Sequence, residues 1–515
     1  MPDLILFNAN VITMDPKLPR AELVVIQNGK IIAVSNNESL MELKKKNTKV
    51  IDCKGKTILP GFIDAHFHLF GFAESLVILN LEPGNNIRSM NDIQTKIRQL
   101  SEQLSPGTWI RGRGYNEFYL TEKRHPNRWD LDSVTTVHPI KLTHRSGRAY
   151  VLNSLGLKLV GISKETADPP EGLIDRDIET GEPTGLLYGM GDYLGKAIPP
   201  LERDQIELGI KLADRELCAL GITSVHDASP RNNLDRWKLI QHWKKEGLLK
   251  TRVKMMLGKE GLEEYRKHRF PVQVDENQVS MGGVKTIVHE TTGQLRPGQF
   301  ELNEMVLNVH RSELQAVLHA IEGKTIEAAC NAVEYALQKS PRSDHRHRIE
   351  HCSVCPSSLA KRIASLEMMV VTQPSFIFYN GDRYLRTVPD SNLQHLYPIG
   401  TLMKNNVAVA GSSDCPVVPA NPIMGVYSAV SRRTEAGDFV LPDEKITPSE
   451  ALKMYTQDAA KATSEERVKG SIEPGKLADM VVLSSDPTKL PANEIKDIEV
   501  EMTILDGEVV WDKMS

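Results

Sequence analysis

The sequence predicts a (β/α)8 barrel of TIM type, accompanied by a β-sandwich and a large insertion. Three observations predict this fold class. The middle of the chain alternates apolar, strand-like runs with longer segments of helical periodicity. Both ends of the chain are rich in short strands. About 150 residues separate the first two strands of the middle region, which is too long for a loop in a compact domain.

Eight runs in the middle of the chain have the length and composition of buried parallel strands. They are TILPGFIDAH (57–66), GITSVHDA (221–228), KTRVKMML (250–257), GGVKTIV (282–288), LQAVLHA (314–320), HRIEHC (347–352), MMVVTQP (368–374) and NVAVAGSSD (406–414). Helical patterns such as KTIEAACNAVEYALQK (324–339) lie between several of them. A doubly wound open sheet is the alternative, but no GxGxxG motif follows the first strand.

The remaining segments predict how the chain is divided into domains. Asn28-Gly29 and Asp506-Gly507 are hairpin turn signals, one near each end of the chain. Each end is too short to bury a core alone, so we expect 1–57 and 468–515 to pair into one composite β-sandwich. We expect 58–71 and 211–467 to form the barrel. The segment 72–210 then forms an inserted domain that covers the barrel mouth.

The composition is that of a soluble globular protein, with 515 residues, 40% hydrophobic residues and 25% charged residues. The net charge of -4 gives no long-range attraction for nucleic acid or an anionic membrane. No apolar run is long enough to cross a bilayer, and the N-terminus lacks the pattern of a secretory signal. Six scattered cysteines predict no disulfide framework, and CSVC (352–355) has no second CxxC to complete a zinc site. We expect a cytoplasmic protein.

Chemically active side chains stand at the ends of several predicted strands. In a barrel these ends meet at the C-terminal face, where catalytic residues lie. Each residue alone is more often a packing or surface residue, but five strand ends that agree favour a metal site. Imidazole and carboxylate ligands suit zinc, with iron, manganese or nickel as alternatives. The residues are His66 and His68 after the first strand, then Lys285, His319, His351 and Asp414.

Lys285 lies inside an apolar strand, where burial disfavours its charged form. A neutral amine reacts with carbon dioxide to give a carbamate, which is an anionic oxygen ligand able to bridge two metals. The alternative is a charged lysine paired with a neighbour such as Glu290.

The chain resembles the amidohydrolase superfamily, and within it amidohydrolase family 3, which contains enzymes like N-substituted formamide deformylase. The motifs that carry the resemblance span nearly the whole chain. They are PGFIDAHFH, HPNRWDLDSV, YVLNSLGL, GEPTGLL, GGVK, HAIEGKTIEAA, HRIEHC, TQPSF, GSSDCPVVPANP and GSIEPGKLADMVVL. The resemblance implies a metal-dependent barrel with a composite β-sandwich, and often a homodimer. Its ligand pattern falls on His66, His68, Lys285, His319 and His351, with Asp414 as the proton carrier beside the metal.

Three departures from the family pattern lie near the expected pocket. SGR (146–148) replaces DGH, HAIEGK replaces HAIGDRA, and HETTG follows the lysine strand in place of DG. These changes bear on the substrate more than on the reaction. Arg148 is suited to bind a substrate carboxylate, although a salt bridge within the insertion explains it equally well. His226, His289, Tyr115 and Tyr188 are further candidates for substrate contact.

The predicted function is hydrolysis of a C–N bond in a small-molecule amide, formamide or cyclic amide. One or two metal ions activate water, Asp414 acts as general base and then general acid, and His319 and His351 hold metal or stabilise the oxyanion. The nearest alternative is a deaminase or imine hydrolase, against which Lys285 weighs. The other alternative is a non-catalytic scaffold, which has no need of this set of side chains.

Overall fold

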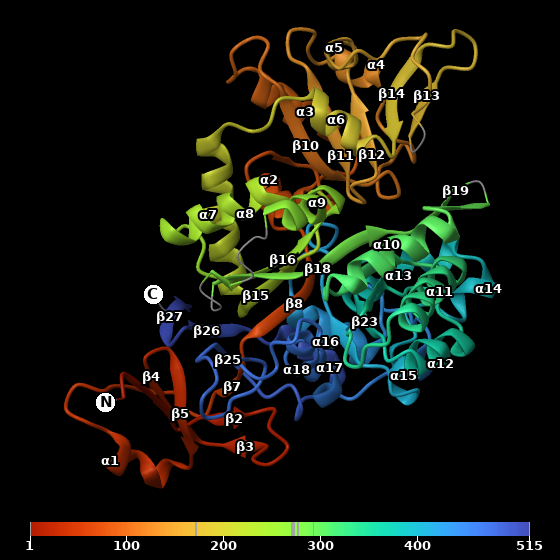
Figure 1. Cartoon of the computed structure of the whole chain (residues 1–515). Helices are drawn as coiled ribbons and strands as arrows, with labels where there is room; N and C mark the ends of the chain where they lie inside the picture. Colours follow the sequence, from red (N-terminus) through yellow and green to blue (C-terminus); the bar gives the residue numbers. More distant parts are fainter. Residues whose placement is uncertain (1, 170–171, 269–272, 275–277, 292, 514–515) are drawn as a thin grey trace. The chain divides into compact units, whose positions relative to one another are not determined.

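The computed structural model describes residues 2–169, 172–268, 273–274, 278–291 and 293–513. The chain forms two compact units, Met1–Leu69 with Asp214–Ser515 and Phe70–Ala213. The first unit holds a parallel β-barrel and two sheets built from the terminal strands (Figure 1). The second unit holds a mixed sheet with its own helices (Figure 1).

Eight parallel strands form a nearly closed barrel, in the order β24-β23-β22-β21-β18-β16-β15-β8. A short ninth strand, β17 (Gln273–Val274), pairs antiparallel with β18. Each of the eight predicted runs overlaps one of these strands. The barrel strands are β8 (Phe62–Phe67), β15 (Ile222–Asp227), β16 (Arg252–Leu257), β18 (Val279–Ile287), β21 (Ala316–Ala320), β22 (Arg348–His351), β23 (Met369–Thr372) and β24 (Val409–Gly411).

Helices alternate with the barrel strands, as the periodicity predicts (Figure 1). Among these helices, α11 (Gly323–Lys339) buries Ile326, Ala329 and Val333, which are spaced three and four residues apart. That spacing puts the three side chains on one face of the helix. The connecting helices are α8 (Leu234–Lys245), α9 (Lys259–His268), α10 (Gln299–Arg311), α11 (Gly323–Lys339), α12 (Ser357–Ser365), α13 (Ser375–Thr387) and α15 (Ile399–Lys404).

The first predicted strand, 57–66, is in fact two strands, which corrects the prediction of a single run. β7 (Thr57–Pro60) pairs with a C-terminal strand, whereas β8 joins the barrel. The break is at Gly61, where an added Cβ would lie 2.3 Å from Oγ1 of Thr223. The backbone passes so close to β15 that only glycine fits, and the chain changes sheets there.

The barrel closes through the loop that follows β24. The backbone N–H of Asp414 donates to the carbonyl of His66 at 2.9 Å, and the N–H of His68 donates to the carbonyl of Cys415 at 3.0 Å. These two bonds join the last strand region to the end of the first barrel strand. They also bring a predicted carboxylate ligand beside the two predicted histidine ligands.

Strands from both ends of the chain form two further sheets. One has the order β27-β26-β25-β7-β2-β3 and the other β5-β4-β1-β6. Their side chains share one buried cluster, which includes Leu6, Ile26, Met480 and Ile504. The strands are β1 (Leu4–Phe7), β2 (Asn10–Ile12), β3 (Arg20–Ala21), β4 (Leu23–Gln27), β5 (Lys30–Ser35), β6 (Lys49–Asp52), β25 (Met480–Leu483), β26 (Val500–Leu505) and β27 (Glu508–Asp512).

Both predicted hairpin turns are confirmed. Asn28 and Gly29 have φ angles of 51° and 70°, and they join β4 to β5. Asp506 and Gly507 have φ angles of 55° and 79°, and they join β26 to β27. Two consecutive residues with positive φ are the signature of the type I′ turn that suits a two-residue hairpin.

The second unit is built on a six-stranded sheet of order β13-β14-β12-β11-β10-β9. The helix α3 (Met90–Ser101) is capped by Ser89 and buries Ile93 and Ile97 in the core that it shares with this sheet. The strands are β9 (Leu79–Asn80), β10 (Ile110–Tyr115), β11 (Ile140–His144), β12 (Ala149–Leu152), β13 (Leu173–Arg176) and β14 (Pro183–Tyr188).

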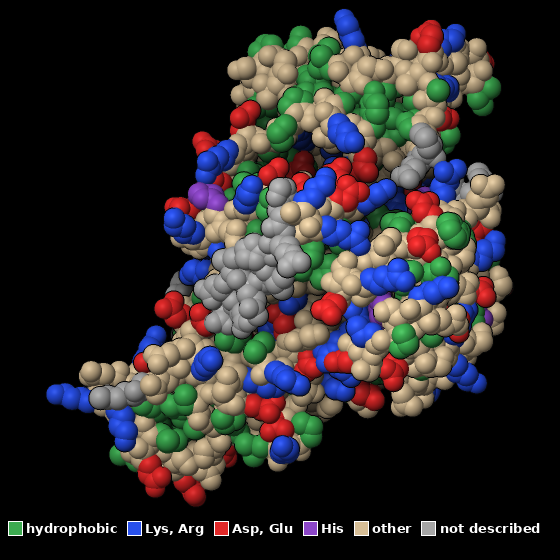
Figure 2. Space-filling model, viewed as in Figure 1, with side chains coloured by type: hydrophobic (Ala, Val, Ile, Leu, Met, Phe, Trp, Pro, Cys, Tyr) green, Lys and Arg blue, Asp and Glu red, His purple; other side chains and the backbone are tan. Residues whose placement is uncertain are grey.

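The surface carries charges of both signs. Figure 2 shows Lys and Arg side chains interspersed with Asp and Glu side chains on the face in view. The six cysteines are buried. Within the described ranges, no helix combines the length and apolar character that a membrane span requires.

Candidate metal centre

His66 and His68 lie at the C-terminal end of β8, and the side chains of both contact Asp414. Oδ1 of Asp414 lies 3.0 Å from Nε2 of His68 and 3.5 Å from Nε2 of His66. These three side chains can offer ligand atoms that all lie within 4.8 Å of one another, the spacing of a metal site. Residues that are far apart in the sequence therefore meet at one barrel mouth.

The electrostatics of this group favour an ionised carboxylate at Asp414 and a neutral imidazole at His66. Burial alone would raise the pKa of Asp414, but the hydrogen bond from His68 and the nearby rings of His66 and His351 hold it well below its ordinary value. Burial and the charge of Lys285 lower the pKa of His66 well below 6.5. A neutral imidazole keeps a lone pair for a cation, and a carboxylate adds negative charge.

The other three predicted ligands surround the same point. Lys285 is buried on β18, with Nζ 3.5 Å from Nε2 of His66. The ring of His351 lies 4.9 Å from that of His66, and the ring of His319 lies 4.3 Å from that of His351. All six predicted ligand positions are thus clustered, whereas their roles as ligands stay predictions.

Two of the clustered residues have a left-handed backbone. His351 has a φ of 72° and Asp414 a φ of 57°, and neither is glycine. His351 ends β22, where regular alternation would point its side chain away from the face that carries Glu350. The left-handed residue breaks that alternation and lets both side chains serve the same site. Such conformations are costly and concentrate at functional sites.

The second ring nitrogen of each of three histidines has its own partner. Nδ1 of His66 contacts the Glu350 carboxylate. Nδ1 of His68 lies 3.1 Å from the Ser229 hydroxyl, which donates to Asp227. Nδ1 of His351 lies 2.8 Å from Oε1 of Gln373.

The directions of these hydrogen bonds fix the tautomers. The Ser229 hydroxyl donates its hydrogen to Asp227, so its oxygen accepts the hydrogen bond from Nδ1 of His68. Gln373 presents its carbonyl oxygen to His351 and donates its amide to Ser412. In the neutral rings of His66 and His351, Nδ1 is therefore the protonated nitrogen and Nε2 carries a lone pair. Imidazole lone pairs held in place by these partners, together with the Asp414 carboxylate, form a donor set that fits a divalent cation.

Asp64 links the end of β8 to the loop that follows β24. Its carboxylate accepts from the backbone N–H of His66 at 3.2 Å and from the backbone N–H of Ser413 at 3.1 Å. Burial raises the pKa of Asp64 to about 7, although its bonds with Ser413 act in the opposite direction. Asp64, Glu350, Ser229 and Gln373 are not among the residues predicted from the sequence. Charged residues inside apolar strands were the available signal for the first two.

The predicted substrate contacts are more scattered. His226 is fully buried inside the barrel, with Nε2 3.3 Å from Oγ1 of Thr463, and burial and the charge of Arg348 lower its pKa well below 6.5. His289 opens the short hairpin of β19 (His289–Thr291) and β20 (Gln294–Arg296). Arg148 is exposed in the turn between β11 and β12 of the second unit. Substrate binding by these residues stays a prediction.

The second unit holds a polar cluster of its own around Tyr115. The Tyr115 hydroxyl lies 3.0 Å from Nδ1 of His125, and Oε2 of Glu117 lies 2.8 Å from Nε2 of His144. Burial alone would raise the pKa of Glu117, but the bond with His144 lowers it to about 2. Of these residues, only Tyr115 was among the predicted substrate contacts.

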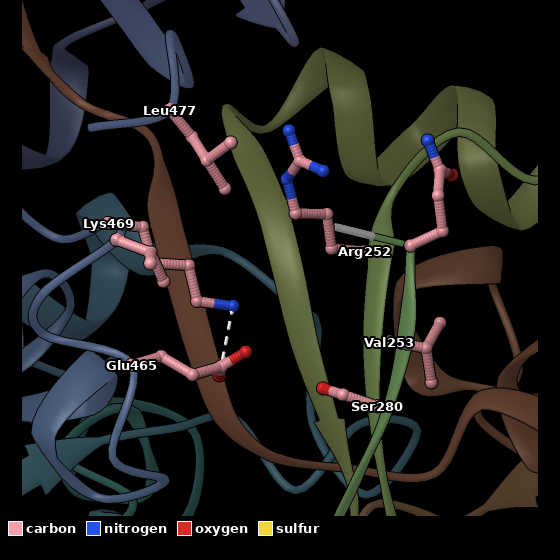
Figure 3. Close-up of a pocket in the computed structure, with 8 residues that line it drawn as sticks. Arg252, Val253, Ser280, Glu465, Lys469 and Leu477 are labelled. Atoms are coloured by element: carbon pink, nitrogen blue, oxygen red, sulfur yellow. Dashed lines mark ion pairs between the residues drawn. The ribbon is translucent and has the colours of Figure 1, made fainter. Parts of the chain in front are cut away.

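A separate pocket lies at the opposite end of the barrel strands, where β16 and β18 begin (Figure 3). Arg252 and Lys469 line it, and both have acidic partners. Arg252 pairs with Asp479 at 2.7 Å, and Lys469 pairs with Glu465 at 3.1 Å. The cations that line this pocket are therefore already paired: Arg252 joins the barrel to the C-terminal segment, and the Lys469 pair lies within that segment.

Comparison with known proteins adds independent information. A sequence model of the amidohydrolase family matches residues 49–511. The chain is 28% identical to the N-substituted formamide deformylase of Arthrobacter pascens, over 100% of this chain and 99% of that protein. It is 27% identical to the putative amidohydrolase YtcJ of Bacillus subtilis, over 98% of each. An uncharacterized metal-dependent hydrolase of Pyrococcus horikoshii shares the fold, with a TM-score of 0.77 at 23% identity over 95% of this chain and 99% of that one.

Proposed function

Because the chain belongs to the amidohydrolase family, we propose that it is a metal-dependent hydrolase that cleaves a C–N bond in a small-molecule amide, formamide or cyclic amide. One observation carries the proposal. The Asp414 carboxylate, late in the chain, lies within 3.0 Å and 3.5 Å of the Nε2 atoms of His68 and His66, early in the chain. A carboxylate beside two imidazoles at a barrel mouth suits water activation.

We assign the metal to the six clustered side chains. They are His66, His68, Lys285, His319, His351 and Asp414. Zinc is the cation that this mixture of imidazole and carboxylate suits best, with manganese, iron and nickel as alternatives, in one or two ions. When bound, such a cation polarises a carbonyl group and lowers the pKa of water from 15.7 to about 7.

Asp414 moves the proton in this proposal. Its lowered pKa keeps it a carboxylate near neutral pH, so it can accept a proton from the attacking water. It then delivers that proton to the leaving nitrogen as the C–N bond breaks. His319 and His351 flank the same point and stabilise the oxyanion of the tetrahedral intermediate.

Lys285 distinguishes the reaction classes. A buried amine beside a neutral imidazole is placed to react with carbon dioxide, losing a proton and forming a carbamate ligand. The alternative is a deaminase or imine hydrolase that activates water in the same way, and that reaction does not require this lysine. A non-catalytic scaffold protein does not require the cluster of six proposed ligands. Both alternatives are therefore less well supported than amide hydrolysis.

The substrate class follows from two features. The relative in Arthrobacter pascens is an N-substituted formamide deformylase, which favours N-substituted formamides among the amides. Arg148 adds a preference for an anionic group, because its planar fork matches a carboxylate. Turnover of acidic and neutral amides by R148A would test this: a selective loss on acidic substrates is expected, and an equal loss on both would contradict it.

Several wider features complete the proposal. The two terminal sheets, which share a core, form a composite β-sandwich, and 72–210 acts as an inserted domain. The protein works in the cytoplasm as a homodimer on a small molecule, without nucleic acid or membrane partners. Gel filtration with light scattering tests the dimer.

The decisive experiment is a hydrolysis screen of purified protein loaded with Zn²⁺ or Mn²⁺. Formamides, other amides, cyclic imides, N-acyl amino acids and aminated heterocycles serve as substrates. We expect turnover of an amide or formamide, lost on chelation. Release of ammonia from heterocycles alone would support the deaminase, and a folded protein without bound metal or turnover would support the scaffold.

A further inference from the structure

Glu350 is a buried carboxylate beneath the proposed metal. It lies on β22, one residue before His351, and is fully buried. One carboxylate oxygen, Oε2, contacts Nδ1 of His66. The other, Oε1, lies 2.6 Å from Nε of Arg348. The carboxylate therefore bridges a proposed ligand and a buried cation.

Arg348 holds the strand that carries this ligand. It lies two residues before Glu350 on β22, so both side chains point to the same face of the strand, into the barrel. Nη2 of Arg348 donates to the carbonyl of Ala65 at 3.0 Å. β22 and β8 are not neighbours in the sheet, so these contacts cross the barrel interior. Arg348 fixes the backbone next to His66, and Glu350 fixes its ring.

We propose that Glu350, supported by Arg348, is the positioning residue that orients His66 for the metal and strengthens its Nε2 as a ligand. This inference rests on the proposed function. A carboxylate that accepts from Nδ1–H holds the ring in one tautomer and makes Nε2 more basic, which raises metal affinity. Glu350 and Arg348 thus act through His66 and do not themselves reach the substrate.

Glu350 differs from the partners of the other two histidines. His68 has a hydroxyl partner in Ser229, and His351 has an amide partner in Gln373. Among these described contacts to Nδ1, Glu350 supplies the negative charge. We therefore expect metal affinity to depend more on Glu350 than on Ser229 or Gln373.

Arg348 is required because a buried charge needs a partner. Arg348 and Glu350 are both fully buried, and together they are neutral. Removing one partner leaves the other charge uncompensated, whereas removing both does not. This gives the design of the test, since the single and double variants separate the metal effect from the folding effect.

The test measures the dissociation constant of Zn²⁺ by competition with a chromophoric chelator. E350Q keeps the size of the side chain and an acceptor oxygen but removes the charge. We expect Zn²⁺ binding to weaken about 10- to 100-fold. The Co²⁺-loaded variant is expected to show shifted visible absorption bands, because one ligand has changed in basicity.

A matched control is another buried ion pair, Arg252 and Asp479, whose side chains are each 4% exposed. D479N removes a buried carboxylate of the same kind, away from the metal ligands. It is expected to lower the unfolding midpoint of the metal-free protein without changing Zn²⁺ affinity. If D479N weakened Zn²⁺ binding as much as E350Q, the effect would be one of general stability and the inference would be overturned.

The double variant R348M/E350Q keeps the inference testable if E350Q does not fold. It removes both buried charges, so it is expected to fold and still to bind Zn²⁺ more weakly than the wild type. If either variant bound Zn²⁺ with wild-type affinity, the role of Glu350 would be overturned while the proposed function would stand. A wild-type protein that binds no divalent metal would overturn the proposed function and, with it, this inference.

Discussion

At the residue scale, the site depends on a few side chains whose partners define their chemical state. The ring nitrogen Nδ1 of each of His66, His68 and His351 faces an acceptor, and in the neutral rings of His66 and His351 this leaves Nε2 free of a proton. Asp414 meets two of these Nε2 atoms and stays ionised. The local hydrogen bonds thus prepare ligands before any cation arrives, which reduces the reorganisation that binding requires.

The first prediction concerns Asp414 as the proton carrier. D414N keeps the shape of the side chain but cannot accept the proton from water. We expect kcat to fall by about 10² to 10⁴ on the amide identified by the screen, since general acid–base catalysis contributes that range. Steady-state kinetics at matched metal content provides the measurement. D235N, which changes an exposed aspartate on α8, is the control, and near wild-type turnover by D414N would contradict the role.

At the element scale, the beginnings of β21 and β22 are held by three buried histidines. Nδ1 of His310 lies 2.9 Å from Nε2 of His347, and Nδ1 of His347 accepts from the backbone N–H of Ala316 at 2.9 Å. Nδ1 of His345 accepts from the backbone N–H of His347. Each ring is thus neutral, and an added proton would break one of these bonds. The cluster is part of the fold and lies at the end of the strands opposite the site.

These histidines predict acid-sensitive stability. Burial lowers the pKa of His345 and holds the pKa of His347 well below 6.5. The unfolded chain binds these protons as the pH falls through about 6.5 and the folded chain does not, so stability decreases below that pH. A histidine that stays neutral in the folded state costs about 1.4 kcal/mol at pH 5.5.

Urea unfolding in the presence of a chelator measures this effect at pH 7.5 and pH 5.5. H345Q removes one titrating ring, so its loss of stability between the two pH values should be smaller than that of the wild type. An equal loss in both proteins would show that the ring contributes nothing to the pH dependence.

The junction between β7 and β8 gives a second prediction at the scale of elements. In G61A the new methyl group meets Thr223 at 2.3 Å, so β8 and β15 must move apart. We expect a loss of about 1 to 3 kcal/mol in the free energy of unfolding, the range for overpacking. Denaturant unfolding measures it. G84A, whose added Cβ has no atom within 4 Å, is the control and should be nearly neutral.

At the scale of the whole molecule, the first unit is organised around the closure of the barrel. The loop after β24 bonds to the end of β8 through the backbones of Asp414 and His68. The same closure places the ligands, so metal binding and the closed barrel should stabilise each other. A ligand that binds only the folded state adds stability by mass action.

Metal removal is the corresponding prediction. Dialysis against a chelator should abolish turnover and lower the melting temperature, and added Zn²⁺ should restore both. At free metal 1,000 times above Kd the added stability is about 4.1 kcal/mol. Calorimetry of the metal-free and reloaded protein measures it. An unchanged melting temperature together with unchanged turnover would exclude a functional metal.

Local sequence signals were enough to predict the strands of the barrel, the hairpin turns and the positions that cluster at the mouth. Strand periodicity and turn residues are local signals, and ligand residues at strand ends converge once the barrel is predicted. Tertiary structure alone decided that the run 57–66 splits at Gly61, since the cause is the approach of Thr223 from a distant strand. It also decided which acceptors face each Nδ1. Glu350 and Gln373 act across the barrel, and no sequence pattern specifies contacts between side chains so far apart in the chain.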